Sequence, residues 1–72
     1  MIRLRVKELI EEKGLTIPKV ARRADLDNNT VYRIVRDPFA EISTVTLSRL
    51  AKGLGMPVKD IFDEVPDNEQ AK

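Results

Sequence analysis

The sequence contains no cysteine and no histidine. Without cysteine the chain forms neither a disulfide nor a thiolate metal site, a composition compatible with a reducing cytoplasm. The absence of histidine removes the most common general base, the most common metal ligand and the usual pH switch. A Gly-rich phosphate loop is also missing. These absences argue against an enzyme, and we expect neither a metal ion nor a cofactor.

Long apolar runs are missing as well. No stretch approaches the ~20 apolar residues that span a bilayer, and the N-terminus lacks the apolar core of a signal peptide. We therefore expect a cytoplasmic protein that binds no membrane. The chain has 72 residues, which corresponds to one domain. A domain of this size buries only roughly 60% of the surface of its unfolded chain.

Charge is abundant but unevenly distributed. Residues 1–58 carry eleven Lys and Arg against seven Asp and Glu, a net +4, whereas residues 59–72 carry two against five, a net −3. A basic body with an acidic end favours binding to a polyanion through one face. We expect the domain to cover residues 1–62 and residues 63–72 to form an acidic, partly disordered tail.

Apolar residues recur at helical spacing along most of the chain. The expected helices are one that ends at Gly14, one each over 17–24, 28–36 and 44–54, and a short fifth helix that begins at Pro57. Thr16, Asp27 and Ser43 are placed to cap the second, third and fourth of these helices. Four to five short helices with tight connections predict an all-α bundle.

The first few residues have a different pattern. Ile2, Leu4 and Val6 alternate with basic residues, and this period of two is compatible with a short strand over 2–5. The alternative is that the first helix starts early. If the strand forms, residues 62–65 are available to pair with it, which would add a short strand pair made from the two ends of the chain.

The segment 17–36 contains two short helices separated by about three residues. So short a turn cannot lay the helices antiparallel, and it makes them cross steeply as in a helix-turn-helix. Ala21 is small where the two backbones are expected to approach. Leu26 is expected to point from the turn into the core, while Val31 and Ile34 hold the second helix against the first.

The other face of that second helix carries side chains suited to reading DNA. At 100° per residue, Asn29, Tyr32, Arg33 and Arg36 share the side opposite the apolar positions, and Asn28 lies at the N-terminal end. Asn pairs with adenine and Arg with guanine in the major groove, and Tyr is suited to a thymine methyl or a phosphate. A solvated polar face is the ordinary explanation for an isolated helix, but the two-helix unit favours DNA recognition.

An ordered series of short stretches resembles the phage repressor and Cro family of helix-turn-helix proteins, often called the Xre family. The series covers about residues 6–62 and consists of VKELIEEKGLT at 6–16, VA at 20–21, TVYRI at 30–34, TLSRLAKGLG at 46–55 and DIF at 60–62. The resemblance implies a compact bundle of the lambda-repressor type. It also implies a bacterial or phage-encoded regulator, acting as a repressor, that binds double-stranded DNA sequence-specifically through the major groove.

The roles of family positions carry over to this chain by the same resemblance. Asn28, Asn29 and Arg33 match positions that touch base edges, and Tyr32 is placed with them. Helix N-termini suit phosphate because of their free N–H groups and positive dipole end. The expected contacts to the DNA backbone come from Thr16, Thr30, Arg36, Ser43 and Thr44.

Three positions depart from the family pattern. Ile17 stands where the family usually has a Gln that braces a base-reading side chain and donates to phosphate. Asp25 replaces the glycine of the turn, and Asp tolerates a left-handed conformation better than most residues. Asp27 replaces a small hydroxyl residue at the helix cap. Because both carboxylates lie close to the expected phosphates, they should weaken nonspecific affinity.

Two other classes of function compete with this interpretation. Asp60, Asp63 and Glu64 resemble an acidic metal cluster, but they lie at an exposed end of the chain, where a solvated acidic tail is the better explanation. A protein-interaction module is the stronger alternative, because members of the family act as antitoxins or co-regulators. The acidic C-terminal tail would then bind the protein partner.

The size of one reading helix predicts a homodimer. A single helix reads only about four or five base pairs, too few to select a site among those of a genome. Two copies on a palindromic operator double the site. The expected contact surface lies around Met56, Val58, Ile61 and Phe62; the alternative, most serious for the last two, is that these side chains belong to the core of one chain.

Overall fold

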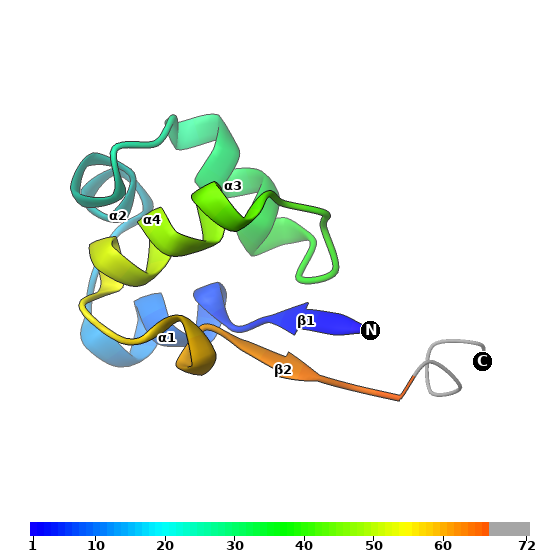
Figure 1. Cartoon of the computed structure of the whole chain (residues 1–72). Coiled ribbons are helices and arrows are strands. Elements are labelled where there is room, and N and C mark those ends of the chain that lie inside the picture. Colours follow the sequence, from blue (N-terminus) through cyan, green and yellow to red (C-terminus); the bar gives the residue numbers. More distant parts are fainter. Residues whose placement is uncertain (67–72) are drawn as a thin grey trace.

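The computed structural model of the chain describes residues 1–66. Its elements are β1 (Ile2–Leu4), α1 (Val6–Lys13), α2 (Ile17–Ala24), α3 (Asn28–Arg36), α4 (Thr44–Leu54), one 3-10 turn (Val58–Asp60) and β2 (Phe62–Glu64). Figure 1 shows the helices gathered around one core, with β1 and β2 side by side along one edge of the body. The predicted bounds of the second, third and fourth helices are confirmed.

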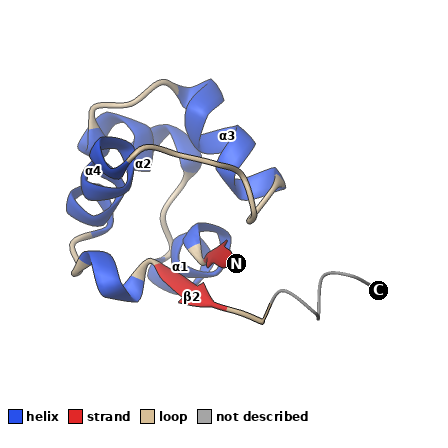
Figure 2. Cartoon of the chain, turned by 45° about the vertical axis from the view of Figure 1, so that its right-hand side comes forward, coloured by secondary structure: helices blue, strands red, loops and turns tan. Residues whose placement is uncertain are grey.

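The strand pair qualifies the prediction of an all-α fold. β1 and β2 are antiparallel, with Ile2 opposite Glu64, Arg3 opposite Asp63 and Leu4 opposite Phe62. The alternation at the N-terminus therefore marks a strand, and the first helix does not begin before Val6. Both strands lie at one end of the helical body (Figure 2), so the fold is a four-helix bundle closed by a small sheet.

The expected fifth helix is present only as a short 3-10 turn. Pro57 is followed only by the 3-10 turn, and the chain then becomes extended to pair with β1. Short 3-10 turns are common connectors of this kind. Ile61 comes directly after the turn and is 0% exposed. It belongs to the core of one chain, which corrects its assignment to a dimer surface.

The core joins all four helices to the sheet. Its largest fully buried side chains are Ile34, Leu50, Ile61, Val6, Val20 and Val31. Burying an aliphatic side chain of this size stabilises the fold by about 1.5–3 kcal/mol. None of the residues in the described range contributes a buried polar or charged side chain. The positions that were expected to hold the third helix in place, Val31 and Ile34, are confirmed as core.

α2 and α4 touch backbone to backbone. A Cβ atom built on Gly53 would lie 2.8 Å from the Cβ of Ala24 and 3.1 Å from the carbonyl oxygen of Val20. The first separation is shorter than real Cβ contacts and the second is tight, so any residue larger than glycine at this position would have to push the two helices apart. Figures 1 and 2 both show α4 lying against α2. The contact fixes the first helix of the helix-turn-helix on the rest of the molecule.

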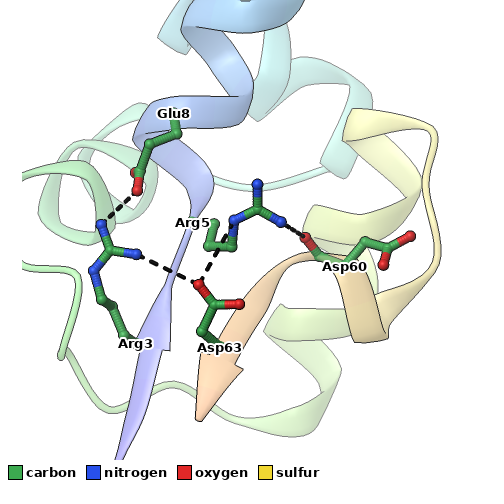
Figure 3. A network of polar contacts seen from close by, with 5 residues as sticks. All are labelled: Arg3, Arg5, Glu8, Asp60 and Asp63. Carbon is green, nitrogen blue, oxygen red and sulfur yellow. Dashed lines mark hydrogen bonds and ion pairs between the residues drawn. The ribbon is translucent and has the colours of Figure 1, made fainter. Parts of the chain in front are cut away.

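Five polar residues tie the two ends of the chain together (Figure 3). Arg3 pairs with Glu8 on α1 and lies 3.6 Å from the carboxylate of Asp63 on β2. Arg5 places its Nε 3.8 Å from the same carboxylate and donates from Nη1 to the main-chain oxygen of Asp60 at 3.2 Å. Asp63, expected in a solvated tail, is thus part of the folded edge. Of the expected tail, residues 67–72 lie outside the described residues.

Candidate nucleic-acid interface

The two helices of the expected helix-turn-helix are joined by residues 25–27 and cross steeply, with α2 seen nearly end-on where α3 runs across the view (Figure 1). Asp25 ends α2 with φ 59°, which confirms that it takes the left-handed conformation of the family's glycine. The N–H of Leu26 donates to the carbonyl of Ala21 at 2.8 Å, and the Leu26 side chain packs against the core. The turn therefore has the geometry that its short length predicts.

The exposed face of α3 brings four predicted residues together. Asn29, Tyr32, Arg33 and Arg36 line one open hollow on the surface, with Asp37 at its end. Tyr32 is 51% exposed, although it is a large aromatic side chain. The hollow combines two guanidinium groups, an amide and a phenol, which together present the donors and acceptors used to read base edges. The opposite side of the helix is held in the core.

The N-terminal end of α3 differs from its prediction at the cap. Asp27 has the extended backbone of an N-cap residue, but its side chain makes no capping hydrogen bond. Asp27 therefore occupies the predicted N-cap position, but it does not make the predicted capping hydrogen bond. Asn28 is exposed in the first turn, and Thr30 is half-buried beside it. The carboxylate of Asp27 remains exposed at the end of the helix, where it opposes the approach of an anion.

The N-terminus of α2 offers little to a phosphate. The hydroxyl of Thr16 accepts from the main-chain N–H of Lys19 at 3.3 Å, which confirms the predicted cap. Pro18 has no N–H, so the first turn of α2 keeps only the N–H of Ile17 for an outside acceptor. The Thr16 hydroxyl is thus already engaged as the acceptor of the capping hydrogen bond.

The N-terminus of α4 is the more open of the two. Ser43 accepts from the N–H of Thr46 at 3.1 Å, again as predicted, and its hydroxyl also donates to the Thr46 side chain at 3.1 Å. Thr44 is exposed, and its side chain makes no hydrogen bond with another described residue. An anion at this end would meet the free N–H groups of the first turn and the Thr44 hydroxyl.

A basic face on α2 escaped the sequence reasoning. Lys19, Arg22 and Arg23 are exposed and follow the i, i+3, i+4 spacing that places side chains on one side of a helix. Within the described part of the chain none of the three forms an ion pair. The signal that could have identified this face is the i, i+3, i+4 spacing of the three cations. They supply three positive charges to the same two-helix unit.

The fold and this surface define a DNA-binding domain of the helix-turn-helix class. The chain belongs to the family of Cro/C1-type helix-turn-helix DNA-binding domains, whose family model matches residues 5–67. This confirms the resemblance drawn from the sequence. The family consists of DNA-binding regulators of transcription rather than enzymes, and no helix in the described range is long and apolar enough to cross a membrane.

Two individual proteins show the same relationship. A prophage-derived HTH-type transcriptional regulator of Bacillus subtilis strain 168, YopO, is 28% identical over 68 residues, which cover 94% of this chain and 96% of that protein. The restriction-modification controller protein C.AhdI of Aeromonas hydrophila has a similar structure, with a TM-score of 0.68 and 28% identity. That similarity covers 78% of this chain and 83% of the controller protein.

Proposed function

We propose that the protein binds double-stranded DNA sequence-specifically with α3 in the major groove, and that it represses transcription by occupying its operator in the bacterial cytoplasm. The observation that carries the proposal is the division of α3 into two faces. Val31 and Ile34 are 0% and 1% exposed, so the helix is held rigidly on the core. The opposite face gathers four polar side chains in one hollow. Rigid support is what sequence reading requires of a helix.

Each side chain of that face has a distinct task. Arg33 pairs bidentately with a guanine edge, and Asn28 and Asn29 pair with adenine through their amide groups. Tyr32 contacts a base, for which a thymine methyl beside its ring is the natural partner. These four side chains form the proposed base-reading set.

Contacts to the sugar–phosphate backbone fix the register of the helix. The proposed set is Thr16, Thr30, Arg36, Ser43 and Thr44. The basic face of α2 adds long-range attraction, because Lys and Arg near phosphates release condensed counterions and so raise affinity. Asp25 and Asp27 act in the opposite sense and keep the affinity for unrelated DNA low, which favours selectivity over tightness.

We further propose that the protein acts as a homodimer on a palindromic operator. Since Ile61 is buried, the surface left for a second copy consists of Met56, Val58 and the outer edge of β2. In the antiparallel register, Phe62 and Glu64 face β1 as non-hydrogen-bonded pairs, so their N–H and C=O groups point outward. An open strand edge of this kind is a template for pairing with another chain. The exposed Val58 precedes β2 by only a few residues, so it lies close to the open edge of β2 along the chain.

The protein-partner alternative stays a prediction. Asp63, the first residue of the expected acidic tail, faces Arg3 and Arg5 at 3.6 and 3.8 Å. An antitoxin or co-regulator role would depend on the residues of the tail that follow it, and DNA binding is the function that we propose.

In vitro selection from a random duplex pool, followed by fluorescence anisotropy at several salt concentrations, tests the proposed function. We expect enrichment of one inverted repeat. The logarithm of its binding constant should fall linearly with the logarithm of salt concentration, by about 0.9 for each phosphate contacted. Failure to enrich any sequence, or binding that does not depend on salt, would overturn the proposal.

A further inference from the structure

α4 holds the end of α2 at two successive turns of the same face. Gly53 lies against Ala24, where a Cβ atom would come within 2.8 Å. Four residues earlier on α4, Arg49 donates from Nη1 to the main-chain oxygen of Asp25 at 3.2 Å. Residues four apart on a helix lie one above the other. One side of α4 therefore contacts both the last residue of α2 and the first residue of the turn.

Asp25 is the point on which the direction of α3 depends. It has the only positive φ among the non-glycine residues of the described range, 59°, and only residues 25–27 separate α2 from α3. A small rotation there swings the whole reading helix. From the α2 side, the turn is fixed by main-chain bonds such as that from the Asp25 N–H to Arg22 at 3.2 Å. From outside the two-helix unit, Arg49 is the only described residue that donates a hydrogen bond to the turn.

We propose that Arg49 is a positioning residue for DNA reading, which holds the turn carbonyl so that α3 keeps its angle to the rest of the domain. The proposal rests on the proposed function, because an angle matters only if α3 reads bases. Both Arg49 and Asp25 are exposed. Because both groups lie outside the buried core, losing the bond leaves the packing of the core in place, and its effect falls on the direction of α3.

The proposal differs measurably from a direct contact between Arg49 and a phosphate. Loss of a phosphate contact weakens binding to every duplex about equally and lowers the salt slope by about 1. Loss of a positioning bond weakens binding to the operator more than to unrelated DNA and leaves the slope unchanged. The ratio of the two affinities and the slope together separate the two roles.

The test uses Arg49→Met, which removes the donors and keeps most of the stem, and Arg49→Lys, which keeps one donor. Lys52→Met is the matched control, because it removes one exposed charge from the same helix, and among the described residues the Lys52 side chain has no hydrogen bond or ion pair. Affinity is measured for the selected operator and for an unrelated duplex of equal length. We expect Arg49→Met to lower the ratio of these affinities about five- to tenfold, the equivalent of one hydrogen bond. Arg49→Lys should restore part of the ratio and Lys52→Met should leave it unchanged.

Amide hydrogen exchange in the free protein gives a second measurement that does not need DNA. We expect Arg49→Met to speed exchange at Asp25 and Leu26 several-fold and to leave the core of α4 unchanged. A wild-type affinity ratio in Arg49→Met, or a salt slope lowered by about 1, would overturn the positioning role. If the wild-type protein selects no sequence, the proposed function fails, and unchanged exchange at the turn would show separately that Arg49 does not hold it.

Discussion

At the scale of single residues, the two faces of α3 predict opposite consequences of substitution. Arg33 lines the exposed hollow, and its side chain has no hydrogen bond or ion pair with any other described residue. We expect Arg33→Ala to cost about 1–3 kcal/mol of operator binding and to relax the preference at one base pair. Anisotropy measures the affinity and repeated selection measures the preference. Thermal unfolding should not change, because the side chain contributes nothing to the core.

Lys13→Ala is the control for this experiment. Lys13 is an exposed cation in the last turn of α1, away from the α3 surface. Its loss should reduce binding only slightly, through long-range charge. Operator binding by Arg33→Ala that equals the wild type would show that the base-reading face is assigned to the wrong side chains.

Asp27 gives a prediction with the opposite sign. Its side chain makes no capping hydrogen bond and leaves a negative charge at the N-terminus of α3. We expect Asp27→Ser to strengthen DNA binding at low salt, with a gain that shrinks as salt screens the charge. A serine is also a good cap, so stability should not fall. Glu12→Ser, at an exposed site on α1, is the control; equal gains from both variants would mean that Asp27 acts only through net charge.

Glu8 links stability to pH. Partial burial acts to raise the pKa of its carboxyl, but hydrogen bonds from its own main chain and from Arg3, with the charges of Arg3 and Arg5, outweigh that effect and lower the pKa below 4.5. Because the folded pKa is the lower one, the contribution to stability is complete above about 4.5 and is lost as pH falls through the folded value. Thermal unfolding between pH 7 and pH 3 should show a deficit for Glu8→Gln at pH 7 that vanishes in acid. Glu12→Gln should show none.

At the scale of elements, the contact between α2 and α4 is the most sensitive to added volume. Gly53→Ala places a methyl group 2.8 Å from the Cβ of Ala24. Overpacking of this kind costs about 1–3 kcal/mol, and the gain in helix propensity of up to about 1 kcal/mol does not offset it. Denaturant unfolding measures the difference, with the exposed Ser48→Ala as the control on the same helix. A stabilised Gly53→Ala protein would show that the two helices separate without cost.

The elements that could be predicted from sequence are those with local signals. The helices over 17–24 and 44–54 begin at hydroxyl caps, and their capping bonds are present. The face of α3 follows from helical period alone. The fifth helix is only a 3-10 turn, because residues 57–62 are too few for a periodic pattern and the chain after the turn pairs with β1. The period-two alternation at residues 2–6 indicated one strand of that pair, whereas residues 62–64 carry no comparable pattern of their own.

Contacts between distant residues account for the rest of what the sequence did not show. Gly53 in isolation indicates only a weak point in a helix; its need for glycine depends on Ala24, which is far away along the chain. The bond from Arg49 to Asp25 likewise depends on how α4 lies on α2. The predicted cap at Asp27 failed for a finer reason, since the position is correct but the side chain does not turn toward the helix.

At the scale of the whole molecule, the basic residues and the proposed DNA-reading face lie apart from the strand pair. The basic residues Lys19, Arg22 and Arg23 and the reading face belong to the two-helix unit. Asp63, near the C-terminal end of the described residues, pairs with Arg3 and Arg5. In Figure 1 the sheet lies on the opposite side of the core from the turn between α2 and α3. A second copy that binds at the sheet would therefore leave both reading helices accessible.

That arrangement leads to the prediction for the dimer. Sedimentation should show self-association in the micromolar range or tighter, and a palindromic operator should bind two copies with half-site centres about 34–36 Å apart, or about 10–10.5 base pairs. Because the free edge of β2 is short, the dimer should be weak in solution and complete on DNA.

Two substitutions test whether the outer edge of β2 and the adjoining surface make that dimer. Glu64→Pro removes an N–H that points away from β1, so it blocks pairing with a second copy and leaves the pairing with β1 in place. Val58→Asp puts a charge on a side chain that is 37% exposed. Both should weaken self-association and cooperative binding to the palindrome, while binding of one copy to a half-site persists. Glu64→Ala, which keeps the N–H, should associate like the wild type.

A one-to-one complex on the full palindrome, formed by a protein that stays monomeric at every concentration, would rule out the dimer. Unchanged association of Glu64→Pro would show that the dimer contact lies elsewhere than the edge of β2.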